Sequence, residues 1–380
     1  MSNAPPAKKL LYLVTEDWYF VSHRLALAVA AREAGYDVVV ATRVDRHAES
    51  IRDAGLGLIP LDFSRSGLGP FHEARTIARL AALYRREAPA LVHHVAMKPV
   101  IYGSLAARAA GIKGVVNAMM GLGYVFSSQS AKARLLRPAV RQGLRSALRG
   151  RNTRVIVQNE DDFALFAKER LARENDLRLI RGSGVDPDAY EVKDPPPGVP
   201  LVILPARILA DKGVREFVAA ARQLKDEGIA ARFALVGDPD PLNPASIPEP
   251  EIAAWVAEGT IEHWGWRPAS EMSGILAEAA IVCLPSYREG LPKALLEAAA
   301  SGRAIVATDV PGCREIVRPG VNGWRVPARD DSSLAAALRA AILDPGLCKK
   351  YGAAGRAMVE QEFSLQSVIR DTLAVYRELA

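Results

Sequence analysis

The 380-residue chain contains few cysteines and few aromatic residues, and it lacks a long apolar run. Its three cysteines, Cys283, Cys313 and Cys348, are odd in number and show no CxxC spacing. This excludes the disulfide framework of a secreted scaffold and favours a reducing compartment. No apolar segment reaches the roughly 20 residues that span a bilayer, and residues 1–9 lack the apolar core of a secretory signal. We therefore expect a cytoplasmic protein that does not span the membrane.

Acidic residues are absent from residues 131–154, a segment that holds eight lysines and arginines. Because the whole chain carries a net charge of +6, the rest of it carries −2, and the basicity is local. On a helical projection, four arginines form one row beside a leucine-rich face: Arg137, Arg141, Arg145 and Arg149.

This basic row is typical of a helix that lies on an anionic membrane surface. The alternative is a helix whose leucines pack in the core while its arginines face water. Nucleic-acid binding is disfavoured, because no aromatic side chains alternate with the arginines.

Short apolar runs alternate with amphipathic helical stretches along the whole chain, and its length favours two domains. We expect strands at residues 10–15, 38–42, 56–61, 91–95, 115–119 and 155–158, and again at 201–204, 233–236, 261–264, 281–284 and 304–308. Most of these runs are continuously apolar, which predicts parallel strands covered on both faces.

The proline-rich segment at residues 194–200 is interpreted as the linker between two α/β domains. The expected domains are residues 1–193, for the acceptor, and 194–363, for the nucleotide sugar. The last helix, residues 364–380, is expected to pack back onto the first domain. Two such domains would place a cleft between the carboxyl ends of their strands.

The densest cluster of reactive side chains is the sequence PSYREGLPK at residues 285–293, between an expected strand and a helix. Seven residues separate Glu289 in the loop from Glu297 inside the helix. Pro292 suits a first helical position, and the N-terminus of such a helix offers N–H groups and a positive dipole end to a phosphate. A capped surface helix with solvated glutamates is the alternative.

A second cluster follows the first strand of the second half, in the sequence PARILADKG at residues 205–213. Arg207 and Lys212 lie five positions apart there, and two cations at the carboxyl end of a strand suit a diphosphate. A pair of solvated side chains is the alternative. A second phosphate-suited loop in the same half favours the diphosphate.

Together these residues resemble the retaining glycosyltransferases of family 4. The resemblance rests on Glu289 and Glu297 as a Glu-seven-Glu motif, on Arg207, and on Lys212 with the glycine after it. It also includes short motifs spread over the second half: 184–186, 237–238, 265, 309–315 and 320–323. It implies the GT-B fold, which is an α/β fold of two Rossmann-like domains with parallel sheets facing a central cleft.

The resemblance also implies roles for these residues in sugar transfer from a UDP-sugar with retention of configuration. Glu289 would hold sugar hydroxyls and steady the developing oxocarbenium charge, while Arg207 and Lys212 would stabilise the leaving diphosphate. Glu297 would bind the ribose hydroxyls. Further donor contacts would come from around Gly237, Gly290, Leu291, Trp266 and Arg267.

We expect no metal ion or other cofactor, because the two cations and the N–H groups near Gly290 and Leu291 supply the positive potential that a diphosphate needs. Asp238 and Asp240 offer a competing interpretation, since two aspartates flanking one residue can bind a metal-bridged diphosphate. The family has a glycine loop at this place, which favours the metal-independent interpretation.

The first half is expected to select the acceptor. His93 and His94 end an expected strand, and a histidine facing the cleft would orient the donor sugar or the acceptor, so His94 is a catalytic candidate. Burial with a hydrogen-bonded ring is the alternative for either residue. Lys98 and the loop of Gly121 and Gly123 are further candidates for the acceptor site.

Family members often carry a Gly-Gly pair after the first strand, whereas residues 15–20 here read TEDWYF. With residues 63–65, 98–99 and 121–123, this segment resembles a bacterial subgroup acting on undecaprenyl-diphosphate-linked sugars, N-acetylgalactosaminyltransferases among them. The subgroup implies transfer of an N-acetylhexosamine to a lipid-linked acceptor, in surface-glycan or glycoprotein-glycan assembly. It also implies peripheral attachment to the inner face of the plasma membrane.

Two other functions fit the same sequence. A UDP-sugar 2-epimerase of the same fold would use the donor without an acceptor, but the Glu-seven-Glu spacing and the basic row favour transfer. A nucleotide-sugar-binding protein at the membrane without turnover is the second alternative. The presence of Arg207, Lys212, Glu289 and Glu297 argues against it.

Overall fold

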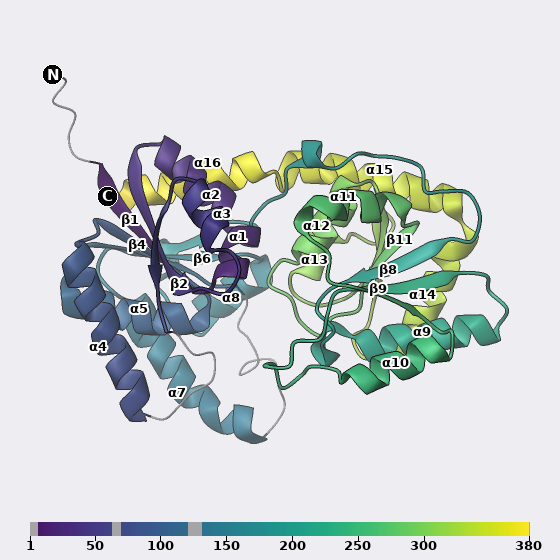
Figure 1. Cartoon of the computed structure of the whole chain (residues 1–380), viewed down its shortest axis with the longest axis horizontal. Helices are drawn as coiled ribbons and strands as arrows, with labels where there is room; N and C mark the ends of the chain where they lie inside the picture. Colours follow the sequence, from purple (N-terminus) through teal and green to yellow (C-terminus); the bar gives the residue numbers. More distant parts are fainter. Residues whose placement is uncertain (1–6, 63–69, 121–130, 380) are drawn as a thin grey trace. The chain divides into compact units, whose positions relative to one another are not determined.

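A computed structural model covers the chain and describes residues 7–62, 70–120 and 131–379. The chain forms two compact units, residues 1–183 with 368–380, and residues 184–367. In each unit, helices cover both faces of one parallel sheet (Figure 1). The expected α/β architecture of two Rossmann-like units is therefore confirmed. The division falls before the proline-rich segment, which belongs to the second unit.

The first unit contains a seven-stranded parallel sheet with the order β3-β2-β1-β4-β5-β6-β7. Its strands are β1 (Lys8–Glu16), β2 (Tyr36–Arg43), β3 (Gly57–Pro60), β4 (Leu91–Val95), β5 (Gly114–Ala118), β6 (Thr153–Val157) and β7 (Leu177–Leu179). Its helices are α1 (Asp17–His23), α2 (Leu25–Glu33), α3 (Ala48–Asp53), α4 (Pro70–Glu87), α5 (Met97–Ala110), α7 (Ala131–Leu148), α8 (Glu160–Lys168) and most of α16 (Leu365–Leu379), with the 3-10 turn η1 (Glu174–Asp176).

The second unit contains a six-stranded parallel sheet with the order β10-β9-β8-β11-β12-β13. Its strands are β8 (Leu201–Pro205), β9 (Arg232–Val236), β10 (Glu262–Gly265), β11 (Ile281–Leu284), β12 (Ala304–Thr308) and β13 (Gly323–Val326). Its helices are α9 (Val214–Asp226), α10 (Glu249–Ala257), α11 (Ala269–Glu278), α12 (Lys293–Ala300), α13 (Cys313–Ile316), α14 (Asp331–Leu343) and α15 (Pro345–Glu362), with the 3-10 turns η2 (Pro187–Ala189) and η3 (Ala210–Lys212).

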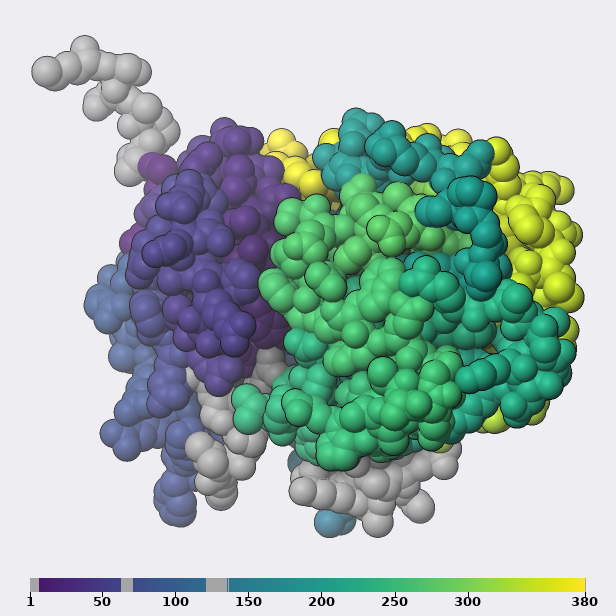
Figure 2. All heavy atoms as spheres, turned by 45° about the vertical axis from the view of Figure 1, so that its right-hand side comes forward, coloured from purple at the N-terminus to yellow at the C-terminus, as the bar shows by residue number. Residues whose placement is uncertain are grey.

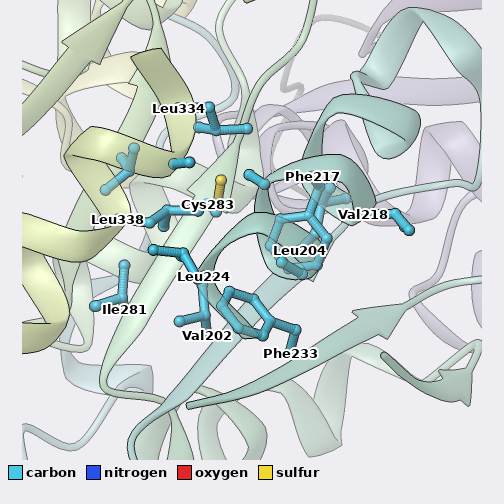
Figure 3. Packing of buried hydrophobic residues seen from close by; sticks show 14 of the residues in the cluster. Val202, Leu204, Phe217, Val218, Leu224, Phe233, Ile281, Cys283, Leu334 and Leu338 are labelled. Carbon is cyan, nitrogen blue, oxygen red and sulfur yellow. The ribbon is translucent and has the colours of Figure 1, made fainter. Parts of the chain in front are cut away.

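The strands of the second unit are apolar on both sides because both faces of the sheet are covered. Along β8, Val202 and Leu204 pack toward α9 and α14, where Phe217 and Phe233 meet edge to face at 5.7 Å (Figure 3). The alternate residues of β8, Leu201 and Ile203, pack toward α11, α12 and α15. A rigid sheet of this kind holds the loops at its carboxyl edge in fixed positions.

The segment from residue 184 to 200 runs over the surface of the second unit beside α15 (Figure 2). Arg356 of α15 donates to the backbone carbonyls of Pro187 and Tyr190, and Lys349 pairs with Asp194 at 2.9 Å. The proline-rich segment is therefore fastened to the second unit.

The C-terminal helix α16 packs on the sheet of the first unit. The hydroxyl of Tyr376 lies 2.7 Å from the hydroxyl of Tyr12 and 2.5 Å from Nδ1 of His93, and all three side chains are buried. Residues from opposite ends of the sequence thus share one core.

Candidate active site

The site is built at the carboxyl edge of the second sheet, where β8 and β11 lie side by side. Connections leave these two strands in opposite directions, since β9 and β10 extend the sheet on one side and β12 and β13 on the other. Open α/β sheets bind ligands at such a switch point. The loop after β8 contains Arg207 and Lys212, and the loop after β11 contains Glu289.

Glu289 is held by two donors. Nζ of Lys212 lies 2.5 Å from Oε1 of Glu289, and the hydroxyl of Ser286 donates to the same oxygen at 2.7 Å. The side chains of Lys212 and Glu289 are 22% and 11% exposed, so this ion pair is shielded yet reachable. The structure therefore brings Lys212 together with Glu289, and it adds Ser286, which the sequence interpretation did not single out.

Close backbone contacts fix the two loops against each other. The N–H of Tyr287 donates to the carbonyl of Asp211 at 2.9 Å. Gly213 has φ +72°, and a Cβ there would lie 2.1 Å from the carbonyl oxygen of Pro285. Gly312 has φ +82°, and its Cβ would lie 2.4 Å from the carbonyl oxygen of Gly290. Glycine is required at both places, because both the conformation and the space exclude a side chain.

Arg207 pairs with an acidic residue from the neighbouring loop. Its Nη1 lies 2.7 Å from Oδ2 of Asp240, and the Arg207 side chain is 43% exposed. Oδ1 of Asp238 accepts the N–H of Trp266 at 3.0 Å. The two aspartates considered as metal ligands thus contact different donors. In the described ranges, no cluster of three histidine, cysteine, aspartate or glutamate side chains has the arrangement of a metal site.

Glu297 lies on α12, and only 8% of it is exposed. Its Oε1 accepts the hydroxyl of Tyr190 at 2.9 Å and lies 3.3 Å from Nζ of Lys293. Burial, reinforced by the Glu297 carboxylate, raises the pKa of Tyr190, so the phenol stays protonated and donates. The sequence alone does not reveal Tyr190 as a contact, because it lies 107 positions from Glu297.

The remaining donor-side candidates surround the same edge. The carbonyl of Gly237 accepts from Nε2 of His263 at 2.9 Å, and Trp266 is 62% exposed. Arg267 lies 3.7 Å from Glu271. Gly290 precedes Leu291, which is buried in the core beneath the loop. No side chain caps the N-terminus of α12, a helix that begins two residues after Leu291.

The structure corrects the catalytic role expected of His94. The ring is fully buried, with Nδ1 2.8 Å from Oδ1 of Asn117 and Nε2 3.1 Å from the hydroxyl of Tyr84. Burial lowers the pKa of His94 to about 4. His93 is also fully buried. Neither histidine reaches a substrate in this arrangement, so the alternative of buried, hydrogen-bonded rings holds.

The family often has a glycine pair after β1, whereas this chain has the buried carboxylate of Asp17 there. Oδ2 of Asp17 accepts the N–H groups of Asp45, Arg46 and His47 at 2.7, 3.1 and 2.9 Å. Burial alone would raise the pKa of Asp17, but these backbone donors lower it below its ordinary value. Asp17 thus occupies N–H groups that could otherwise bind a phosphate.

Of the candidates for the acceptor site, the structure describes Lys98. Lys98 is the second residue of α5, and its Nζ lies 3.4 Å from Oε1 of Glu73 and 5.3 Å from the ring centre of Tyr102. Gly121 and Gly123 lie outside the described residues.

The arginine row on α7 is partly occupied by contacts within the first unit. Arg141 pairs with the Glu169 carboxylate at 3.1 Å, and Arg145 donates to the Glu169 carbonyl at 2.9 Å. Arg137 is half-buried. On the other side of the helix, Leu144 and Leu148 are fully buried in the core. This corrects the expectation of a leucine face on the membrane, because those two leucines pack inside the protein.

Comparison with known proteins gives the family. Residues 9–159 match the family described as Glycosyl transferase 4-like, and residues 199–344 match Glycosyl transferases group 1. A Campylobacter jejuni N,N'-diacetylbacillosaminyl-diphospho-undecaprenol alpha-1,3-N-acetylgalactosaminyltransferase is 30% identical, over 79% of this chain and 80% of that enzyme. The chain belongs to the family 4 glycosyltransferases.

Other proteins of known structure share the fold of this glycosyltransferase. Sucrose-phosphate synthase from Thermosynechococcus elongatus superimposes with a TM-score of 0.82 at 19% identity, covering 98% of this chain and 99% of that chain. Anabaena HepE, solved in complex with UDP and glucose, gives a TM-score of 0.77 at 16% identity, covering 98% and 100%. The glycosyltransferase is therefore an enzyme of the GT-B class. No helix in the ranges described above is long and apolar enough to cross a membrane.

Proposed function

We propose that this glycosyltransferase transfers a sugar from a UDP-sugar to an undecaprenyl-diphosphate-linked sugar, with retention of configuration. The observation that carries the proposal is the contact of Lys212 and Ser286 with Glu289 at the switch point of the second sheet. The site combines a positioned carboxylate with a cation where sheets of this kind bind nucleotides. Arg207, on the same loop after β8 as Lys212, is assigned to this site.

In this proposal the leaving diphosphate lies near Arg207, Lys212 and the uncapped N-terminus of α12. These groups supply positive potential where negative charge develops on the leaving group. Glu289 holds sugar hydroxyls and steadies the developing oxocarbenium charge. Since Lys212 is bonded to Glu289, it also sets the position of that carboxylate.

The nucleoside is assigned to the outer part of the same edge. Glu297 takes the ribose hydroxyls, with Tyr190 fixing its carboxylate through the 2.9 Å hydrogen bond. Backbone groups near Gly237, Trp266 and Arg267 contact the base. The exposed indole of Trp266 offers an apolar surface beside them.

We propose that turnover needs no metal ion or other cofactor. Asp240 is engaged by Arg207 and Asp238 by the Trp266 N–H, so both carboxylates already serve the protein's own donors. Arginine, lysine and helix N–H groups are then the source of leaving-group stabilisation.

The acceptor is proposed to be a lipid-linked sugar that receives an N-acetylhexosamine. The support is the similarity, over 79% of this chain, to an enzyme named for transfer of N-acetylgalactosamine to a diphospho-undecaprenol acceptor. Such an acceptor requires peripheral attachment to the cytoplasmic membrane face. The arginines of α7 that remain accessible favour an anionic surface.

A donor screen tests the proposal. Single-turnover nucleotide release is measured for a set of UDP-sugars, with and without a diphospho-lipid-linked sugar acceptor. We expect release to depend on the acceptor and to favour a UDP-N-acetylhexosamine. Conversion of the UDP-sugar to its 2-epimer without acceptor would instead identify the epimerase, and binding without release would identify a binding protein.

A further inference from the structure

A basic pocket lies in the first unit, between the end of α7 and the turn after α8. It has a volume of about 560 Å³ and is lined by residues of α7, the residue that follows α7 and the turn after α8: Gln142, Arg145, Ser146, Arg149 and Arg170. Gln142, Arg145 and Ser146 lie on one face of α7, and Arg149 continues that face one residue beyond the helix end. Three arginines and no acidic residue line the pocket.

The walls of this pocket are fixed by the core beneath them. Leu144 and Leu148 on the opposite side of α7 are fully buried against Phe166 of α8 and Leu171 after it. The two helices therefore hold their arginines at a defined separation, unlike basic side chains on a mobile tail.

Compensation of helix dipoles is the simplest alternative explanation for arginines at this place, because both helices end here. That role is already filled by other contacts. Arg108 of α5 donates to the Ser146 carbonyl in the last turn of α7, and Arg145 donates to the Glu169 carbonyl at the end of α8. Arg149 and Arg170 are not needed for it.

Arg149 and Arg170 also lack a neutralising acid. The nearby Glu169 carboxylate pairs with Arg141 at 3.1 Å. Across the part of the chain that the structure describes, no carboxylate lies within 4 Å of either arginine. The pocket thus carries an uncompensated positive charge.

Arg170 adopts a left-handed backbone conformation, which is unfavourable for any residue with a side chain. Its φ is +50°, and the bonds from Arg170 N to Ala167 O and from Leu171 N to Phe166 O, both 3.0 Å, form a Schellman turn. Glycine is the preferred residue at this position, since a side chain there is strained. An arginine in its place indicates that the guanidinium serves the pocket at some cost to stability.

We infer that this pocket binds a phosphate group, either free diphosphate or the phosphate of a lipid headgroup. Guanidinium groups pair with phosphate through charge-assisted hydrogen bonds, and Ser146 and Gln142 add neutral donors. The biological source of the phosphate rests on the proposed function, while the binding itself rests on the pocket.

The test compares three proteins for binding of inorganic diphosphate by calorimetry. They are the wild type, the pocket variant Arg149→Gln with Arg170→Gly, and a control variant Arg75→Gln with Arg79→Gln. The control loses the same charge from two exposed arginines of α4. The donor site is unchanged in all three, so any difference belongs to the pocket.

Diphosphate binding at the donor site is common to all three proteins, so the expected difference is one further site. We expect the wild type and the control to show this site, and the pocket variant to bind diphosphate there at least about tenfold more weakly. Its melting temperature should not fall, because glycine relieves the strain at residue 170. Equal affinity in all three proteins, or no binding by the wild type, would overturn the inference.

A vesicle arm then identifies the source of the phosphate. Wild type and pocket variant are sedimented with phosphatidylglycerol vesicles, with and without inorganic diphosphate. Pocket-dependent sedimentation that diphosphate displaces indicates a lipid headgroup. Equal sedimentation of both proteins, with pocket-dependent diphosphate binding, indicates a soluble phosphate. Turnover on a short, water-soluble acceptor is measured in parallel, because its absence would contradict the proposed function and leave the pocket intact.

Discussion

At the scale of single residues, the ion pair of Lys212 with Glu289 links two loops that are 77 positions apart in sequence. The sequence indicated both residues through their motifs, but it predicted separate roles for them. It could not predict Ser286 or Tyr190 as partners, because a serine and a tyrosine without a motif gain meaning only from their neighbours. A hydrogen bond between loops far apart in the chain leaves no repeating pattern in the sequence that could predict it.

Replacing Lys212 tests the cationic part of the site. Lys212→Ala removes a leaving-group donor and releases Glu289, so we expect turnover to fall by about two orders of magnitude. The measurement is single-turnover nucleotide release, with Lys225→Ala as the control for loss of an exposed lysine in the same unit. Comparable turnover in both variants would show that Lys212 has no role in transfer.

For the two histidines, residue type and position in the sequence predict the wrong role. A histidine at the carboxyl end of a strand suits catalysis, yet the sequence does not reveal that Tyr84 and Asn117 enclose His94. Gly103 packs directly on this ring, since a Cβ there would lie 2.6 Å from it. Burial of this kind is a property of the packed core.

Buried His94 makes the first unit sensitive to acid. The folded state keeps the ring neutral because burial lowers its pKa to about 4, while the unfolded chain binds a proton near pH 6.5. Protonation thus favours unfolding as pH falls from about 6.5 toward 4. We expect a loss of about 2 kcal/mol between pH 7 and pH 5.

The measurement is amide hydrogen exchange of β4, corrected for intrinsic rates, at pH 7 and pH 5. His94→Gln keeps a polar side chain at this position, but glutamine does not titrate. The variant should therefore lose less unfolding free energy than the wild type between pH 7 and pH 5. The same loss in both proteins would contradict this account.

At the scale of elements, continuous apolar runs predicted most of the strands. β4, β11, β12 and α16 have the expected bounds to the residue or nearly so. The short strands β7 and β13 were missed, because three or four residues at a sheet edge carry little apolar signal. The apolar pattern after the first strand predicts one helix over residues 22–34, whereas in the structure α1 ends at His23 and α2 begins at Leu25.

The glycine contact between η3 and the loop after β11 provides a test at this scale. Gly213→Ala places a Cβ against the Pro285 carbonyl and should displace the loop that carries Glu289. Gly228→Ala is the matched control, since its φ is +76° and nothing lies within 4 Å of the added Cβ. We expect each to cost about 1 kcal/mol of stability from its conformation.

Turnover should separate the two variants. Gly213→Ala is expected to lose at least about tenfold in turnover per folded molecule, because misplaced catalytic groups act poorly. Gly228→Ala should retain it. If both variants turned over equally fast, the loop contact would be structural only.

At the scale of the whole molecule, two units of similar topology have different loop chemistry. The second sheet presents an arginine, a lysine and a glutamate at its switch point. At the corresponding place of the first sheet, Asp17 occupies the backbone donors of the next loop. The proposed leaving-group chemistry therefore depends on residues of the second unit. The resemblance to family 4 predicted that the donor-site residues lie in the second half. The periodicity of the strands alone does not distinguish the two halves.

The proposed metal independence is tested on the whole enzyme. We expect turnover with excess EDTA to match turnover without it, because protein cations stabilise the leaving group. The assay is repeated after dialysis against chelator and again with added magnesium or manganese. Loss of turnover that only a divalent ion restores would favour Asp238 and Asp240 as metal ligands.

The central claim is that Glu289, held by Lys212 and Ser286, serves sugar transfer in a folded enzyme. It is tested most directly by acceptor-dependent product formation from a UDP-N-acetylhexosamine, with wild type and Glu289→Gln compared at equal folded concentration. The account predicts product with the wild type, a loss of about two orders of magnitude in the variant, and an unchanged melting profile. Equal product formation by both proteins would contradict it.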